Sequence, residues 1–215
     1  MTVQKSQNVL TNNTNGGKTI KKNTNGNRSA PKATDFVEQS TGVKKDVPLE
    51  IEAAVKGANP KFQRGTPYSA NCQRCVQAYE FRRRGYDVVA KPAANNIISW
   101  GSECFIQPNA YQYSYQAYSL GNSESTIKKV LSQAPDGSRF SIYIKWQRQY
   151  GGSAHVFIAE KTNGVIRYLD PQTGDLDVSR YFSMGSKGHF GYFRMDDKSI
   201  TNDTKIIFET VEAKK

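Results

Sequence analysis

The stretch AHVFIAEKTNGVIRYLDPQTG, residues 154–174, contains two β-strand patterns on either side of Asn163-Gly164. An Asn-Gly pair is the strongest short-range signal for a two-residue hairpin, because both central positions of a type I′ turn need a positive φ. Counting outward from this turn, Glu160 faces Arg167 as an ion pair, and apolar residues face apolar residues. The stretch therefore predicts an antiparallel hairpin with a defined register.

The same register places a histidine and a carboxylate together. Asp170 faces Phe157 in it, so Asp170 lies on the same sheet face as His155, one diagonal away. Diagonal neighbours lie roughly 7–8 Å apart at Cα, within reach of an imidazole–carboxylate hydrogen bond. A slip of one residue would put the two side chains on opposite faces. The pairing is thus predicted as firmly as the turn itself.

Helical patterns precede the hairpin, and most of the strand patterns surround or follow it. The predicted helices cover residues 48–56, 72–85 and 125–135, and the predicted strands cover 86–92, 139–150, 154–160, 165–170, 188–196 and 204–212. Helices followed by an antiparallel sheet indicate an α+β fold, with N-terminal helices packed on the sheet. Gly85 is expected to end the helix at 72–85.

The N-terminal part has a different composition. Residues 1–46 are rich in Asn, Thr, Gly and Lys, and their few apolar residues have no period, so we expect a disordered basic arm. Residues 47–215 form the predicted folded domain. The chain has 30 Lys and Arg against 19 Asp and Glu, a net charge of +11. This balance suggests an acidic partner such as nucleic acid, held by the arm, or else simply a soluble basic tail.

Further charge and hydropathy signals are weaker. Arg82, Arg83 and Arg84 are interpreted as a solvated helix end beside the favourable C-terminal dipole, with a substrate-docking patch as the alternative. No apolar run approaches the ~18 residues of a membrane span, and the sequence shows no conventional signal peptide.

A cysteine stands where the helix at 72–85 should begin. Only the thiolate of cysteine is a nucleophile, and a helix N-terminus or a nearby imidazolium favours this form. Cys72 is placed for both influences, and a carboxylate behind His155 would fix the imidazole tautomer. Cys75, one turn further along the helix, is the fallback nucleophile. These residues predict a thiol nucleophile with His155 and Asp170 as its partners.

Other interpretations of the same residues stay open. Cysteine is often an ordinary core residue, and Asp-Pro-x-x-Gly is an ordinary turn. A zinc site is the main competitor, since Cys72-x-x-Cys75 has ligand spacing and Cys104 with His155 or His189 would complete it. We expect no metal, with Cys104 and His189 structural. A non-catalytic basic binding module is the remaining alternative.

Three segments together resemble a known family. NCQRCVQAYEFRRRGYDVVAKP, AHVFIAE and RYLDPQTGD resemble the papain-fold toxin domains, glutamine deamidases of bacterial polymorphic toxins and phage-associated proteins, over roughly residues 57–195. The resemblance implies a papain-like cysteine-hydrolase fold and a triad of Cys72, His155 and Asp170, without a cofactor. An oxyanion hole is also needed, for which Asn71 and Gln172 are the candidate side chains beside the Cys72 N–H.

The resemblance also implies a reaction and partners. The thiolate would attack a glutamine side chain of a protein substrate, release ammonia and leave a thioester that hydrolyses to glutamate. A cysteine protease or a transglutaminase would use the same intermediate, and these activities remain alternatives. The implied partners are a protein with a target glutamine and an immunity protein. The implied setting is a bacterial cytoplasm, with delivery to a target cell or association with a virion.

Overall fold

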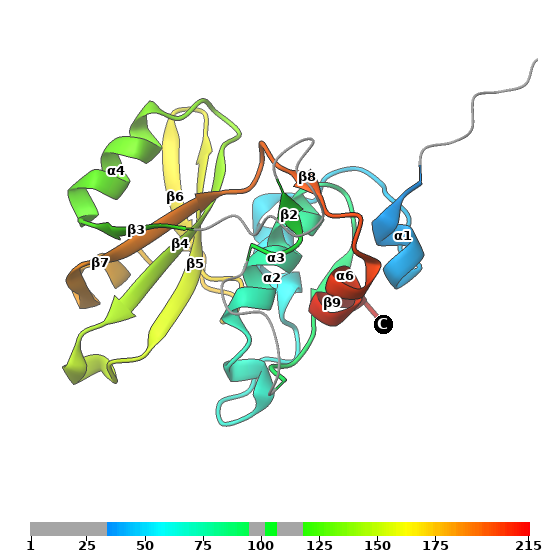
Figure 1. Ribbon diagram of the computed structural model, residues 1–215, viewed down its shortest axis with the longest axis horizontal. Coiled ribbons are helices and arrows are strands. Elements are labelled where there is room, and N and C mark those ends of the chain that lie inside the picture. The colour runs from blue at the N-terminus through cyan, green and yellow to red at the C-terminus, as the bar shows by residue number, and fades with distance from the viewer. Residues whose placement is uncertain (1–33, 95–101, 107–117) are drawn as a thin grey trace, which may run out of the picture. The chain divides into compact units, whose positions relative to one another are not determined.

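A computed structural model describes residues 34–94, 102–106 and 118–215 (Figure 1). The chain divides into two units, residues 1–33 and 34–215, and all described residues belong to the second. The helices of two turns or more are α2 (Ile51–Ala58), α3 (Cys72–Arg83) and α4 (Glu124–Gln133). The shorter helices are α1 (Phe36–Thr41), α5 (Tyr181–Met184), α6 (Thr204–Thr210) and two 3₁₀ turns, η1 (Pro67–Ser69) and η2 (Arg148–Tyr150).

A five-stranded antiparallel sheet forms one layer of the domain. Its strands, in spatial order, are β3 (Ser119–Asn122), β7 (Gly185–Arg194), β4 (Arg139–Trp146), β5 (Ala154–Thr162) and β6 (Val165–Leu169). Two small two-stranded sheets join β1 (Val88–Ala90) to β9 (Val211–Ala213) and β2 (Phe105–Ile106) to β8 (Ser199–Ile200). The predicted α+β class is confirmed.

The β5–β6 hairpin has the predicted register. Asn163 and Gly164 have φ of 52° and 76°, as a type I′ turn requires. Glu160 is paired with Arg167, and the ladder continues to Ile158 opposite Leu169. The turn chemistry therefore determines which residues share a face of the sheet.

Helices cover both faces of the sheet. Figure 1 shows α4 on one side, and α2 and α3 on the other. Because strand side chains alternate, Ile142 and Ile144 of β4 join the core under α4 and α5, whereas Tyr143 packs against the core built around α3. The sheet thus has an apolar core on each face, and the core that Tyr143 packs against is the one that positions α3.

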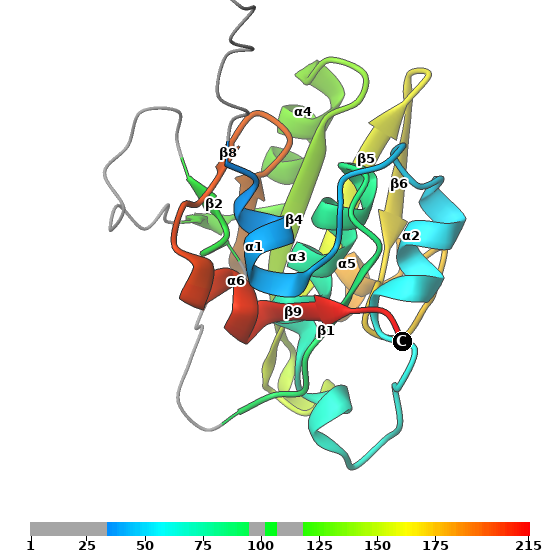
Figure 2. The ribbon, with the colours of Figure 1, turned by 90° about the vertical axis from the view of Figure 1, so that its right-hand side faces the viewer.

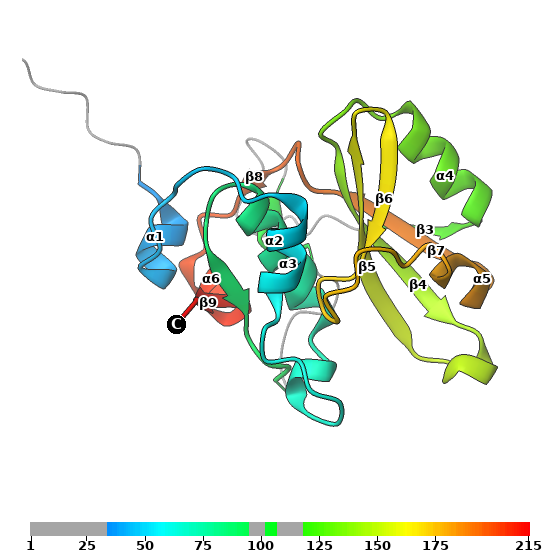
Figure 3. The same cartoon turned by 180° about the vertical axis from the view of Figure 1, so that it is seen from behind.

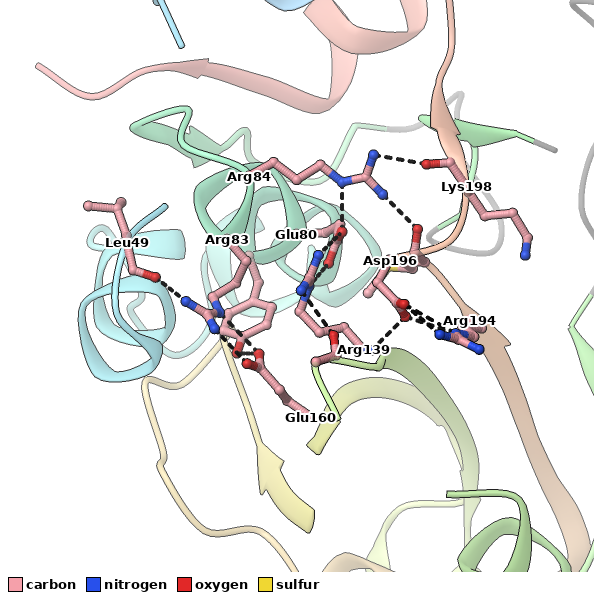
Figure 4. Close-up of polar contacts among 12 residues, drawn as sticks. Leu49, Glu80, Arg83, Arg84, Arg139, Glu160, Arg194, Asp196 and Lys198 are labelled. Atoms are coloured by element: carbon pink, nitrogen blue, oxygen red, sulfur yellow. Dashed lines mark hydrogen bonds and ion pairs between the residues drawn. The ribbon is translucent and has the colours of Figure 1, made fainter. Parts of the chain in front are cut away.

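Buried ion pairs fasten α3 to its surroundings (Figure 4). The carboxylate of Glu80 binds Arg84 at 2.7 Å and Arg139 of β4 at 2.6 Å, and Glu160 of β5 binds Arg83 at 2.7 Å. Both glutamates are fully buried. The interpretation of Arg82–Arg84 as a solvated helix end is wrong, because acidic residues and backbone carbonyls from distant segments surround these guanidinium groups.

Arg82 fits the same description. Its side chain is 2% exposed, and it binds Asp87 and the carbonyls of Val88 and Ala53. A Cβ added at Gly57 would lie 2.2 Å from Arg82 Nη2, so α2 can approach this guanidinium closely only at a glycine. Gly57 lies inside α2, which ends at Ala58, two residues beyond the predicted end at residue 56.

Two other predictions differ from the structure. The strand predicted at 204–212 is α6 followed by β9, because Asp203 accepts from the N–H groups of Lys205 and Ile206 and starts a helix there. The predicted arm includes a folded segment, since α1 begins at Phe36 and Val37 is buried in the core. The rest of the arm, residues 1–33, lies outside the described residues.

Figure 2 shows α1, α6 and the β1–β9 pair gathered together. The Tyr86 hydroxyl donates to Asp35 at 2.9 Å, and the Asp46 N–H donates to the Gly85 carbonyl at 2.8 Å, which holds the start of the folded unit against the end of α3. Gly85 has φ of 98° and ends α3 as predicted.

Within the part of the chain that the structure describes, none of the helices has the length and apolarity to cross a membrane.

Candidate active site

The N-terminus of α3 opens into a pocket of about 450 Å³. Cys72, the first residue of α3, lines it together with His155 and Asp170. Figure 3 shows the segment after β6 running from the sheet toward α3, which carries Asp170 to this position. Three residues that are distant in the sequence therefore meet at one cavity.

His155 and Asp170 form a buried hydrogen-bonded pair. Nε2 of His155 lies 3.0 Å from Oδ2 of Asp170, and the two side chains are 10% and 1% exposed. Burial lowers the pKa of His155, but its hydrogen bonds with Asp170 and Cys72 outweigh burial and raise the pKa to about 10. Because Nε2 faces the carboxylate, Nδ1 is the ring nitrogen through which His155 can exchange a proton with the Cys72 thiol. The pair is therefore an imidazolium and a carboxylate at neutral pH.

The Asp170 carboxylate has three donors. Its Oδ2 accepts from His155 and from the Tyr181 hydroxyl at 2.9 Å, and its Oδ1 accepts from the Gln172 N–H at 2.9 Å. Burial raises the pKa of Asp170, but these donors and the charge of His155 lower it below its ordinary value. The carboxylate consequently stays ionised in a buried place.

One detail of the predicted register differs. The β5–β6 ladder ends at Ile158 and Leu169, and the Asp170 N–H donates to the Asp175 carbonyl at 2.9 Å instead of pairing near Phe157. Pro171 has no N–H with which to continue a ladder, and the chain turns here. The carboxylate reaches His155 from this turn.

The amide of Gln172 lies at the N-terminus of α3. With its oxygen toward the helix, Oε1 accepts from the N–H groups of Asn71 at 3.1 Å and Cys72 at 3.0 Å. With its nitrogen there, Nε2 donates to Asn71 Oδ1 at 3.2 Å. Either orientation places this amide next to the Cys72 N–H and in the lining of the pocket.

The structure does not bring Asn71 and Cys75 to the pocket. Asn71 is 1% exposed, and its amide donates to the Lys91 carbonyl at 2.9 Å. Cys75 is fully buried, its thiol lies 3.3 Å from Asn71 Oδ1, and burial raises its pKa well above the ordinary value. These two residues support the helix start from inside the core.

The residues of the zinc alternative are dispersed. Cys104 is buried and its N–H donates to Gln77 at 2.8 Å, whereas His189 is an exposed residue of β7. Over residues 34–94, 102–106 and 118–215, no group of three His, Cys, Asp or Glu side chains is arranged to hold a metal ion. The geometry gives the zinc alternative no support.

Two aromatic residues of the site were not predicted from the sequence. The Trp146 ring stacks on the His155 ring at 5.7 Å between centroids, and the Tyr181 ring meets the same imidazole edge-on at 5.8 Å. Trp146 had a detectable signal, because the β4–β5 pairing places it diagonally next to His155. Tyr181 had none, since it lies in a single helical turn after an irregular segment.

Comparison with known proteins agrees with this geometry. Residues 70–175 match the family described as papain fold toxin 1, glutamine deamidase. The matched segment begins just before α3 and ends just after the turn that carries Asp170 and Gln172, so it includes every described residue that lines the pocket except Ser69 and Tyr181. No curated protein matches the chain.

Proposed function

We propose that the protein is a cysteine-dependent protein glutamine deamidase, because residues 70–175 match the family described as papain fold toxin 1, glutamine deamidase. In this proposal Cys72 is the nucleophile, His155 is the acid–base group and Asp170 orients His155. The observation that supports it best is the convergence of these three side chains on one pocket, with 3.0 Å between His155 and Asp170.

The first half-reaction forms a thioester. The Cys72 thiolate, paired with the His155 imidazolium, attacks the carboxamide carbon of a substrate glutamine. The negative charge that develops on the carboxamide oxygen is stabilised by the Gln172 amide, whose oxygen accepts from the Cys72 N–H so that its nitrogen turns toward the pocket. His155 then gives its proton to the departing nitrogen, which leaves as ammonia.

The second half-reaction restores the enzyme. Neutral His155 takes a proton from a water molecule, which attacks the thioester carbonyl and releases a glutamate side chain and the Cys72 thiolate. Proteolysis and transglutamination would share the thioester. The described residues that line the pocket include no Lys or Arg, which suits a neutral carboxamide better than an acidic side chain.

The proposal includes partners and a setting. The substrate is a protein with a target glutamine, and a toxin of this kind would need an immunity protein to protect the cell that makes it. Synthesis in a bacterial cytoplasm, with delivery to a target cell without a conventional signal peptide or with a virion, is the corresponding setting.

The test compares the protein with its Cys72→Ala variant on a protein extract from candidate target cells. We expect glutamine residues that gain about one dalton with the wild type and none with Cys72→Ala, as measured by peptide mass spectrometry. Cys75→Ala is the matched control and should retain deamidation if it folds, because Cys75 lies outside the pocket.

The other outcomes separate the alternatives. Chain cleavage would identify a protease, and glutamine–lysine crosslinks would identify a transglutaminase. Equal modification by the wild type and Cys72→Ala would exclude Cys72 as the nucleophile.

A further inference from the structure

Tyr181 contributes a hydroxyl to the interior of the site from an element outside the matched segment. It is the first residue of α5, it is 9% exposed, and it lines the same pocket as Cys72 and His155. Its hydroxyl donates to Oδ2 of Asp170 at 2.9 Å, the same oxygen that lies 3.0 Å from His155 Nε2. Oδ2 of Asp170 therefore lies within hydrogen-bond distance of two groups, the His155 imidazole and the Tyr181 hydroxyl.

The Tyr181 ring is itself held in place. It packs edge-on against Trp146 at 5.0 Å and against Phe157 at 5.5 Å, and it meets His155 at 5.8 Å. Perpendicular aromatic contacts of this kind are specific in direction as well as favourable. The phenol hydroxyl thus cannot turn away from Asp170 without disturbing three other rings.

We propose that Tyr181 is a positioning residue, which holds the Asp170 carboxylate in the orientation that His155 requires. The inference rests on the proposed roles of Cys72, His155 and Asp170. A carboxylate that is fixed only by the Gln172 N–H through Oδ1 could rotate about that bond and move Oδ2 away from the imidazole. The hydrogen bond from Tyr181 prevents this rotation.

The charges around Tyr181 agree with a donating phenol. Burial and the negative charge of Asp170 raise the pKa of Tyr181, so the hydroxyl keeps its proton at neutral pH. Asp175 and Arg180 are the nearby charged groups outside the pocket. They lie 3.6 Å from each other on the surface, and the Arg180 guanidinium lies 5.5 Å from the Tyr181 ring centroid. Among the described residues, the other titratable group that acts on His155 besides Asp170 is the Cys72 thiol.

The experiment measures the rate of Cys72 alkylation by iodoacetamide at pH 6 to 9, because this rate reports the thiolate and needs no substrate. Tyr181→Phe removes the hydroxyl and keeps the ring contacts. We expect it to slow alkylation at pH 6.5 by about three- to tenfold, which corresponds to the net contribution of one ordinary hydrogen bond. Tyr168→Phe is the matched control, because Tyr168 packs against Phe182 instead and should leave the rate unchanged.

A double-mutant cycle distinguishes positioning from a general effect on structure. In an Asp170→Asn background, Tyr181→Phe should cause no further slowing, since the carboxylate through which it acts is gone. Equal slowing in both backgrounds, or no slowing in the wild-type background, would overturn the proposal for Tyr181. NMR titration of the two histidines gives a second readout, in which Tyr181→Phe should lower the pKa of His155.

The His155→Ala variant separates the role of Tyr181 from the proposed function of the site. If His155→Ala leaves the Cys72 rate unchanged in an otherwise wild-type protein, the proposed cysteine–histidine pair is wrong. If His155→Ala slows the reaction and Tyr181→Phe does not, only the role of Tyr181 is wrong.

Discussion

Cys72 and Cys75 lie one turn apart on the same helix, yet their surroundings differ. Cys72 lines the pocket and interacts with His155, whereas Cys75 is fully buried and its thiol lies against Asn71. Thiolate formation is favoured by a neighbouring positive charge and opposed by burial among neutral groups. The two thiols should therefore differ in their reactivity toward alkylating reagents at neutral pH.

We predict that iodoacetamide labels Cys72 well before Cys75 in the folded protein between pH 6 and 8. The pKa of His155 is about 10, so its imidazolium persists through this range and is lost as the pH rises through 10. His155→Ala should slow Cys72 labelling at pH 6.5 by at least tenfold. Peptide mass spectrometry after timed quenching measures each cysteine separately.

The unfolded protein in urea is the control, in which all three cysteines should react alike. Similar slow rates for Cys72 and Cys75 in the folded protein would contradict an activated thiol at Cys72.

At the scale of elements, α3 must be held against the sheet, because α3 carries Cys72 and β5 carries His155. Glu160 makes that link from β5: it binds Arg83 at 2.7 and 3.1 Å and also accepts from the Tyr79 hydroxyl. A buried charge that loses its partner is costly, typically about 3–5 kcal/mol. The ion pairs of α3 are therefore a requirement of the site's geometry as well as of stability.

We predict that Glu160→Gln lowers the free energy of unfolding by about 3 kcal/mol, since it leaves the Arg83 guanidinium without a charged partner in the core. Urea denaturation followed by tryptophan fluorescence measures the change. Glu52→Gln is the control, because Glu52 pairs with Lys56 on the exposed side of α2 at 2.5 Å. Its substitution should leave the free energy of unfolding nearly unchanged, because a solvent-exposed ion pair contributes little. Equal effects of the two substitutions would show that the buried pair contributes no more than a surface one.

Elements that depend on local chemistry were predictable from the sequence. The Asn163-Gly164 turn determined the hairpin register as far as Leu169, the residue before Asp170, and Gly85 marked the end of α3. The strand predicted at 204–212 was wrong, because the capping by Asp203 outweighs the β-branched residues that follow it.

Contacts between distant segments were not predictable in the same way. Arg83 pairs with Glu160 of β5, and Arg84 donates to carbonyls of the segment after β7. Only the contact of Arg84 with Glu80 of the same helix is local in sequence. Tyr181 reaches Asp170 because α5 packs into the same core as β4 and β5, where the Tyr181 ring contacts Phe157. Cys72, His155 and Asp170 stand in local patterns and could be proposed from the sequence, whereas Tyr181 depends on long-range packing and was missed.

At the scale of the whole molecule, charge is distributed unevenly along the chain. Residues 1–33 contain six Lys or Arg and no Asp or Glu, so about half of the net charge of +11 belongs to this segment, and +5 remains on residues 34–215. The described side chains of the pocket belong to the second unit. Catalysis and electrostatic binding should therefore be separable.

We predict that a variant lacking residues 1–33 keeps its melting temperature within about 2 °C and keeps the alkylation rate of Cys72, because the described residues of the core and of the pocket belong to the unit 34–215. If the segment binds nucleic acid through its six cations, its removal should weaken binding and reduce the salt dependence, the slope of log K against log salt, by up to about five. Fluorescence anisotropy with labelled DNA at several salt concentrations measures this slope. An unchanged slope would place the binding cations on residues 34–215, and a large fall in melting temperature would show that residues 1–33 belong to the folded unit. A deletion that abolished Cys72 reactivity while preserving the fold would instead tie the segment to the site itself, and it would contradict the separation of catalysis from binding.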